Sequence, residues 1–482
     1  MSEASLKKKT AIAIAWSSFD KIGTQLVFFV IGILMARMLS QTEYGLVGML
    51  GVFSALSSVL IDGGFSSALI RKTNATEQDY NSVFYFNIGL SSSIYLILFF
   101  SAPAIAQFFH QPLLTPIARV IFLSIIINSL GLIQATLLAK HIRFKQNSLS
   151  NVLSLLFSGM VALFLAYRGY GVWALVWQNV SATFFRVSLL WIFGKWYPKL
   201  IFSLSSLKEQ IHYSMEMTLA GFLGTIFQNI YSLIIGKFFP IIQLGNFTQA
   251  SKMSDMPINT LSGSIYNATF PIYSAIKDDA ERLKRAFQKT IRFTSFITFP
   301  VLMGLALIGP NVLEVLLTKK WEGSFVYFQL LCLAGIPTIF TAIIQNFIRI
   351  NERVTIFIYF ELAKIGILIA AFLSTIHFGI FIVVVGIVAM RYAVYLMNLI
   401  FIGRKVNYRW SEQLRDMLPC FVISVAMVAV IYPLSWVIEN RILLIISQII
   451  VGGVFYLGVN KLLKSKILDD VLSIVFKKNR SL

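Results

Sequence analysis

Ionisable residues in the middle of apolar segments are the features of this 482-residue sequence that could do chemistry. Lys252 and Asp255 are three positions apart, and Glu361 and Lys364 repeat that spacing. Residues at i and i+3 lie on one face of a helix, so each acid would lie beside a base. Two interpretations stay open for these pairs: the charges neutralise each other, or they line a functional cavity.

Two arginines lack such a neighbour. Neither Arg186 nor Arg391 has an acidic residue within one turn on its own predicted helix, and Arg391 lies about halfway along its segment. An arginine at that depth needs a partner on another helix, a water-filled cavity or an anionic ligand. We therefore predict that these two residues serve function.

Asp62 is the third kind of candidate. It lies in the segment SVLIDGGF and is followed by two glycines, which loosen a helix. A titratable gate and a hydrogen bond that packs two helices are both open interpretations.

Four further ionisable residues lie within about two turns of a predicted membrane surface rather than at depth. Asp20, Lys21 and Glu216 are near the inner surface, and Arg119 is near the outer surface. Side chains at such positions can extend to the interface, so we expect them to have structural roles.

The elements that must position these residues are membrane-spanning helices. Hydrophobic residues make up 57% of the chain and charged residues 13%, whereas soluble proteins carry about 25% charged residues. Apolar runs of ~20 residues can cross a bilayer as helices, and these runs lack the alternation of barrel strands. We predict an all-α polytopic membrane protein with about 14 transmembrane helices, at residues 14–39, 44–70, 82–105, 114–138, 148–167, 171–194, 213–236, 244–273, 291–310, 325–349, 354–376, 379–403, 417–438 and 441–460.

The distribution of Lys and Arg predicts the orientation of these spans. If the N-terminus lies inside, the inner segments hold 29 Lys and Arg residues and the outer segments hold six. Such an excess is typical of cytoplasmic loops, so both termini are expected in the cytoplasm. The same distribution accounts for the net charge of +20 without a nucleic-acid partner.

An internal repeat is visible at an offset of 200 positions. Residues 33–46 (ILMARMLSQTEYGL) align with 233–246 (LIIGKFFPIIQLGN), which places Arg37 on Lys237 and Gly45 on Gly245. Six spans precede the second copy, so both copies have the same orientation, as in transporters built from parallel repeats.

The repeat predicts two six-helix lobes related by a parallel pseudo-two-fold axis, followed by two C-terminal helices. Two segments are expected on the membrane surface: residues 277–290, with Leu283 and Phe287 on one face, and the C-terminal tail. The predicted regions are a cytoplasmic N-tail at 1–13, an N-lobe at 14–194, a cytoplasmic linker at 195–212, a C-lobe at 213–403, two helices at 404–460 and a cytoplasmic amphipathic tail at 461–482.

The sequence lacks the motifs of several enzyme and ATP-driven transporter classes. The nucleotide-binding pattern G-x-x-x-x-G-K-[ST] does not occur, so ATP is not expected as the direct fuel. The four histidines are far apart without metal-ligand spacing, and G-x-S-x-G is absent. Because no predicted outer loop can house a catalytic domain, we expect a protein that is not an enzyme and that uses neither a metal nor an organic cofactor.

Several segments together carry a resemblance to a known family. They are KKKTAIAIAW, LMARMLSQTEYGL, LIDGGFSSALIRK and LAKHIRFKQNS in the first half, and FPIYSAIKDDAERLKRAF and LLTKKWEGS in the second. The set resembles the Wzx-type lipid-linked oligosaccharide flippases of the polysaccharide transporter family, within the multidrug/oligosaccharidyl-lipid/polysaccharide exporter superfamily. The similarity is greatest to exporters of the colanic acid and teichuronic acid kind and covers nearly the whole chain in order.

The resemblance implies a function. Two lobes would surround a central cavity, and an undecaprenyl-pyrophosphate-linked oligosaccharide would cross the bacterial cytoplasmic (inner) membrane for lipopolysaccharide, capsule or exopolysaccharide synthesis. A membrane polymerase and a chain-length regulator are the implied protein partners. Cations suit the pyrophosphate, and the candidates are Arg186, Lys252, Lys364 and Arg391.

An ion gradient of H⁺ or Na⁺ is the expected energy source. The candidates for ion coupling or gating are Asp62, Asp255 and Glu361. Two alternatives stay open: a multidrug or organic-cation antiporter on the same scaffold, which would need an acidic cavity, and a membrane polysaccharide polymerase.

Overall fold

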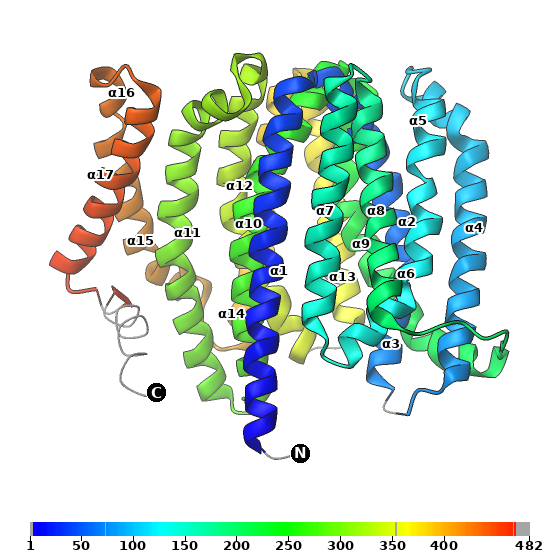
Figure 1. Cartoon of the computed structure of the whole chain (residues 1–482). Helices are drawn as coiled ribbons and strands as arrows, with labels where there is room; N and C mark the ends of the chain where they lie inside the picture. Colours follow the sequence, from blue (N-terminus) through cyan, green and yellow to red (C-terminus); the bar gives the residue numbers. More distant parts are fainter. Residues whose placement is uncertain (1–2, 73, 277, 352–353, 466, 469–482) are drawn as a thin grey trace. The chain divides into compact units, whose positions relative to one another are not determined.

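The structure is a computed structural model that describes residues 3–72, 74–276, 278–351, 354–465 and 467–468 (Figure 1). The described residues form α-helices and short 3-10 helices without a strand, which confirms the predicted all-α fold. By packing, the chain divides into two compact units, Met1–Thr248 and Gln249–Leu482.

Over its described residues, the first unit contains nine helices and the start of a tenth. Within it, α7 packs against α8 and α1, and α2 packs against α9; Figure 1 shows α7 and α8 side by side. The bounds are α1 (Glu3–Met38), α2 (Gln41–Asp62), α3 (Phe65–Arg71), α4 (Glu77–Phe108), α5 (Leu114–Ile121), α6 (Leu123–Lys140), α7 (Phe144–Tyr167), α8 (Val172–Gly194), α9 (Leu204–Phe238) and α10 (Ile241–Ala275), which continues into the second unit.

In the second unit, α11 packs against α12 and α15, and α14 packs against α12 and α13. The bounds are α11 (Ala280–Leu317), η1 (Lys319–Trp321), α12 (Glu322–Asn351), α13 (Val354–Thr375), η2 (Ile376–Phe378), α14 (Ile380–Lys405), α15 (Trp410–Ile431), α16 (Leu434–Val437) and α17 (Arg441–Leu462).

Each of the fourteen predicted spans corresponds to helical structure, but not all are equally apolar. Within the described part of the chain, eleven helical stretches are long and apolar enough to cross a membrane. The predicted spans at 171–194, 213–236 and 244–273 are the helices α8, α9 and α10, which lie outside that set. Polar residues such as Gln178 in α8 and Gln249 in α10 lower their hydropathy. The count of fourteen crossings and the lobe boundaries stay predictions.

Two predicted surface segments have different outcomes. Residues 280–290 form the first turns of the continuous helix α11 rather than a separate surface helix, and Leu283 and Phe287 are buried in it. Residues 469–482 of the predicted amphipathic tail lie outside the described residues.

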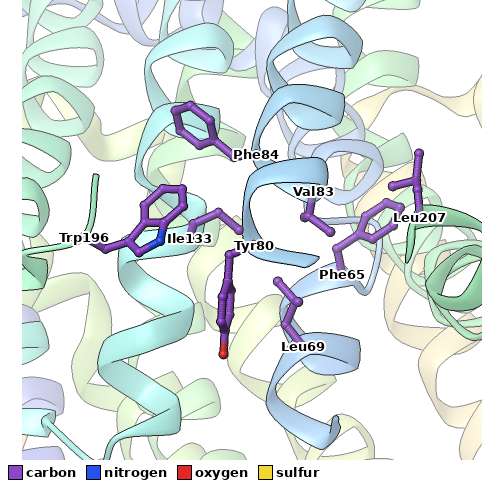
Figure 2. Packing of buried hydrophobic residues seen from close by; sticks show 8 residues of the cluster. All are labelled: Phe65, Leu69, Tyr80, Val83, Phe84, Ile133, Trp196 and Leu207. Carbon is purple, nitrogen blue, oxygen red and sulfur yellow. The ribbon is translucent and has the colours of Figure 1, made fainter. Parts of the chain in front are cut away.

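A hydrophobic cluster holds one end of the first unit together (Figure 2). Trp196 follows α8 and packs edge-to-face against Phe84 of α4, with ring centroids 5.5 Å apart. The Trp196 carbonyl accepts a hydrogen bond of 2.6 Å from Gln134 Nε2 of α6, which satisfies a buried backbone group. The cluster thus joins α3, α4, α6, the segment after α8 and the start of α9, through Phe65, Leu69, Tyr80, Val83, Phe84, Ile133, Trp196 and Leu207.

Charged side chains also stabilise this end of the first unit, around α3 and the start of α4. Lys140 Nζ donates to the carbonyl groups of Leu69 and Lys72, at 2.9 and 2.8 Å, and so caps the last turn of α3. Lys72 in turn forms an ion pair of 3.1 Å with Asp79, which also caps α4 together with Thr76. The lysines that predict a cytoplasmic side therefore also hold this end of the fold in place.

Tyr408 forms a comparable centre in the second unit. Its fully buried ring packs against Phe287, with centroids 6.4 Å apart, and Phe287 packs against Phe347. The hydroxyl donates to Asp416 Oδ2 at 2.5 Å, and Arg292 contacts the other carboxylate oxygen at 2.9 Å. Burial, followed by the hydrogen bond to the Asp416 carboxylate, raises the pKa of Tyr408, so the phenol keeps the proton that it donates.

The glycines that align in the sequence repeat make a reciprocal contact. A Cβ atom at Gly45 would lie 2.5 Å from the Ile241 carbonyl oxygen, and a Cβ atom at Gly245 would overlap the backbone of Gln41. Only glycine permits this approach of the first turns of α2 and α10. Positions 41 and 241 are equivalent at the offset of 200, so each copy contacts the other through equivalent residues. This contact supports the repeat, which stays a prediction.

Candidate functional site

In the first unit, Arg186 of α8 has a partner on another helix. Its Nε atom donates a hydrogen bond of 2.9 Å to Asn151 Oδ1 on α7. The Asn151 amide donates to both carboxylate oxygens of Asp20 on α1, at 3.2 and 3.1 Å. Asn151 thus links the guanidinium to a carboxylate, and the three residues form one polar network across three helices.

The same network changes the interpretation of Asp20. The sequence predicts that this carboxylate extends to the inner surface, but it accepts hydrogen bonds from Asn151 and from Thr24 Oγ1, the latter at 3.2 Å. Close packing of α1 on α7 makes this possible, because Gly159 leaves room for Ile31. Asp20 has the expected structural role, but through a helix interface.

Arg391 in the second unit has a sparser environment. It is half-buried on α14, and its Nη1 atom donates to Thr338 Oγ1 on α12 at 3.4 Å, near the upper limit for a hydrogen bond. Asp255 on α10 is a charge neighbour of Arg391. The two do not form an ion pair in the described part of the chain, so the structure brings a cation and an anion near each other without joining them.

The hydrogen-bond partner of Asp255 is a serine rather than Lys252, the lysine one turn away. The Asp255 carboxylate accepts a hydrogen bond of 3.0 Å from Ser251 Oγ, and Arg391 of α14 is a charge neighbour. The Lys252 side chain is exposed. Mutual neutralisation by the i, i+3 spacing therefore does not describe this pair, and α10 presents the two charges separately.

Glu361 and Lys364 of α13 do neutralise each other. Lys364 Nζ lies 2.5 Å from Glu361 Oε1, and the two residues are only 4% and 2% exposed. Moving two charges out of water is costly unless they pair, which explains the short contact. The second oxygen, Glu361 Oε2, is buried without a hydrogen-bond partner. That oxygen is a position where a proton or small cation could bind.

Asp62 ends α2, and the two glycines after it break the helix. Gly63 and Gly64 have φ angles of 51° and 70°, the left-handed region that favours glycine. The exposed Asp62 carboxylate accepts a hydrogen bond of 2.7 Å from Ser66 Oγ in α3. This contact is local to the break and does not pack two distant helices.

The remaining charges near the membrane surfaces have local environments. Arg119 stacks over the Phe99 ring, with its guanidinium carbon 4.4 Å from the centroid, and Lys21 is exposed. The side chain of Glu216 lies outside the described residues.

Sequence reasoning missed the neutral partners of these charges. Asn151, Thr338 and Ser251 each contact a candidate residue, but polar neutral residues are common in the predicted spans. Only Ser251, four positions before Asp255, carries a signal in its spacing.

Comparison with known proteins shows the family of the chain. The profile of the family described as "Polysaccharide biosynthesis protein" matches residues 34–326. The chain is 23% identical over 372 residues to the lipopolysaccharide biosynthesis protein WzxC of Escherichia coli (strain K12), covering 76% of this chain and 75% of that protein.

Solved structures show the same fold. One is described as "Lipid II flippase MurJ, inward closed conformation", with a TM-score of 0.74 and 16% identity over 96% of this chain and 99% of that one. Another is an inward-facing multidrug resistance MATE transporter of the MOP superfamily, with a TM-score of 0.62 and 18% identity over 82% of this chain and 98% of that one. The chain therefore shares the all-α fold of these membrane transporters, and the pseudo-two-fold repeat stays a prediction.

Proposed function

The chain belongs to the polysaccharide biosynthesis protein family, and from this premise we propose that it is a flippase for lipid-linked oligosaccharides. Its substrate is a repeat unit joined to a polyprenyl pyrophosphate, and it moves this unit between the leaflets of the bacterial cytoplasmic membrane. The fold shared with a lipid II flippase over nearly the whole chain supports this function. The protein acts as a transporter rather than an enzyme.

The environment of Arg391 is the observation that supports the proposal most strongly. Arg391 is a half-buried guanidinium on a membrane helix that forms no ion pair with any described residue. Its charge is therefore available to an anion, and arginine matches phosphate oxygens with two parallel hydrogen bonds. Lys252 adds a second exposed cation on α10. We assign the pyrophosphate to Arg391 and Lys252 and give supporting roles to Arg186 and Lys364, which Asn151 and Glu361 hold in place.

Translocation is driven by an ion gradient in this proposal. Glu361 is the leading candidate for coupling, because its buried Oε2 atom has no hydrogen-bond donor while Oε1 holds Lys364. Binding of H⁺ or Na⁺ there changes the charge balance of the Lys364 pair. Asp255 and Asp62 are the remaining candidates.

Glu361 and Lys364 make a testable pair. Glu361→Gln should lower the amount of folded protein, because breaking a buried ion pair costs about 3–5 kcal/mol. The double variant Glu361→Met, Lys364→Met should restore folding, since apolar residues replace both charges, but it should lose the dependence of transport on the ion gradient. Folded protein is measured by size-exclusion chromatography, and transport in vesicles with an imposed gradient. Normal gradient dependence in the double variant would remove Glu361 from the coupling.

The decisive experiment is deletion and complementation in the host. Surface polysaccharide is scored together with the leaflet in which lipid-linked repeat units accumulate. Accumulation on the cytoplasmic side, reversed by this chain, is the expected result. Intact units that reach the outer leaflet unpolymerised would favour a polymerase, and unchanged glycans and lipid intermediates would favour an organic-cation antiporter.

Both termini face the cytoplasm in this proposal, and a polymerase and a chain-length regulator act on the translocated units. The ratio of basic residues between the two sets of loops supports the orientation. Cysteines placed at Lys284 and Lys319 test it: a membrane-impermeant thiol reagent added to intact spheroplasts should label the second position and not the first.

A further inference from the structure

A groove of about 500 Å³ lies between α13 and α14, and the charged residues assigned to the pyrophosphate are not part of its lining. A volume of this size is within the range of small-molecule sites, which is about 300–1,000 Å³. It is open on one side and lies entirely within the second unit. The groove is lined by Tyr359, Phe360, Ala363, Met397, Ile400, Phe401, Arg404 and Lys405.

The walls of the groove are apolar. Phe360 and Phe401 pack edge-to-face with ring centroids 4.8 Å apart and join the two helices at its floor. Tyr359 and Ile400 are 66% and 48% exposed. In a membrane such a surface is covered by hydrocarbon chains, so the walls by themselves do not select an occupant.

The selective feature is the charge at one end. Arg404 and Lys405 form the last turn of α14, and the Lys405 ammonium lies 5.8 Å from the centroid of the Phe401 ring, above the wall. The exposed Arg404 guanidinium has no ion-pair or hydrogen-bond partner in the described part of the chain. Two adjacent cations therefore stand at the end of an apolar groove.

The position of this end fits the inner surface of the membrane. Tyr359 lies in the second turn of α13 and Arg404 in the last turn of α14, so the start of one helix and the end of the other share one end of the pair. With the N-terminus inside, the segments 349–353 and 404–416, which follow the tenth and twelfth predicted spans, lie on the cytoplasmic side. Met397 lies seven residues before Arg404, roughly 10 Å deeper along the helix. The cations thus lie at headgroup depth and the walls extend into the hydrocarbon layer.

We propose that this groove binds the isoprenoid diphosphate part of the substrate, with the diphosphate at Arg404 and Lys405 and the first isoprene units against the aromatic wall. The assignment rests on the proposed function. Two neighbouring cations match the two phosphates of one headgroup, whereas a phospholipid offers a single phosphate in its headgroup linkage. The groove is then a loading site at the cytoplasmic leaflet, separate from the Arg391 site within the membrane.

The test measures binding of undecaprenyl diphosphate to the purified full-length chain in nanodiscs made of a neutral phospholipid. Arg404→Gln with Lys405→Gln should weaken binding by about tenfold or more, the effect of losing charge-assisted hydrogen bonds. The charge-retaining double variant Arg404→Lys, Lys405→Arg should bind within a few-fold of wild type. Lys461→Gln with Lys464→Gln removes the same charge from the exposed end of α17 and is the matched control.

A second variant tests the walls without changing the charge. Ala363→Trp fills the groove and should weaken binding of undecaprenyl diphosphate to a similar extent, while size-exclusion chromatography confirms that the protein is folded. Unchanged binding in both the charge and the wall variants overturns the proposal. Displacement of the probe by equimolar phosphatidylglycerol also overturns it, in favour of a general anionic-lipid site.

The binding experiment on the groove and the complementation experiment on the flippase can fail independently of each other. Wild-type complementation of the deletion strain tests the flippase, and it does not depend on the groove. Complementation by the wild type together with unaltered probe binding in the variants refutes the groove alone. Weakened binding in the variants, with a wild type that does not affect lipid-linked intermediates, supports the groove and refutes the flippase.

Discussion

Arg186 and Arg391 belong to one class in the sequence and to two in the structure. Both are arginines within predicted spans with no acid within one turn on the same helix. In the first unit, Arg186 reaches Asp20 through the Asn151 amide. In the second unit, Arg391 has a long hydrogen bond to Thr338 and a nearby carboxylate, that of Asp255, with which it forms no ion pair.

The difference between the environments of the two arginines indicates which of them is available to bind a ligand. A buried cation that is already compensated stabilises the helices around it, and its charge is largely used within the protein. A cation without a contacting anion keeps most of its charge for an external ligand. By this criterion the proposed function assigns substrate binding to Arg391, whereas Arg186 links α8 to α7 and, through Asn151, to α1.

The largest expected effect is that of Arg391→Ala. Charge-assisted hydrogen bonds are worth about 1.5–3 kcal/mol, so transport should fall by about 10- to 150-fold and surface polysaccharide with it. The protein should still insert and fold, since Arg391 has few internal contacts. Polysaccharide is measured on cells with matched protein levels, with Lys319→Gln as a control on an exposed cation. Normal polysaccharide in Arg391→Ala would remove this residue from the mechanism.

Arg186→Ala should act on stability instead. It leaves Asn151 Oδ1 without its donor and Asp20 without the positive charge beside it, at a cost of about 1–3 kcal/mol. The melting temperature in detergent should fall, and polysaccharide should decrease only in proportion to the amount of folded protein. A protein of normal stability that no longer transports would show that both arginines bind substrate, and the comparison would fail.

Asn151→Ala should give a smaller loss of stability, about 0.5–1.5 kcal/mol, because it removes hydrogen bonds but no charge. A double-mutant cycle with Arg186→Ala sharpens the assignment. If the amide links the two charges, the losses should not add, and the interaction energy should be about 0.5–3 kcal/mol. Additive losses would mean that Arg186 and Asn151 act independently.

Thr338→Val should have the smallest effect. The 3.4 Å contact with Arg391 is long, so its removal should change stability by no more than about 0.5 kcal/mol. Transport should stay within a few-fold of wild type. A large loss of transport without a loss of folded protein would instead make Thr338 the residue that orients Arg391.

The sequence predicted the helices well because their signal is local. Apolar runs of bilayer length mark most of the long helices, and Gly63 and Gly64 mark a break that the structure places between α2 and α3. The family could also be predicted, because its motifs lie in order along most of the chain. The segment before residue 291 was predicted less well, since Leu283 and Phe287 indicate an amphipathic helix but not that it continues into α11.

The candidate site could be predicted only as a set of charges. The i, i+3 spacing of Glu361 and Lys364 gives a true pair, whereas the same spacing of Lys252 and Asp255 does not. Side-chain direction decides between them, and spacing alone does not fix it. The groove between α13 and α14 gives no sequence signal, because its aromatic residues match those of any membrane helix.

By itself, the sequence determined that this is a helical membrane protein, the family to which it belongs and the small number of charges that its helices bury. These properties depend on composition and on patterns within one span, which are set before the helices pack. The tertiary structure alone decided which charges are compensated, because Asn151 and Asp20 are 131 positions apart. Packing brings such residues to 3.1–3.2 Å or leaves them apart, and the energy of a charge inside a membrane depends on that distance.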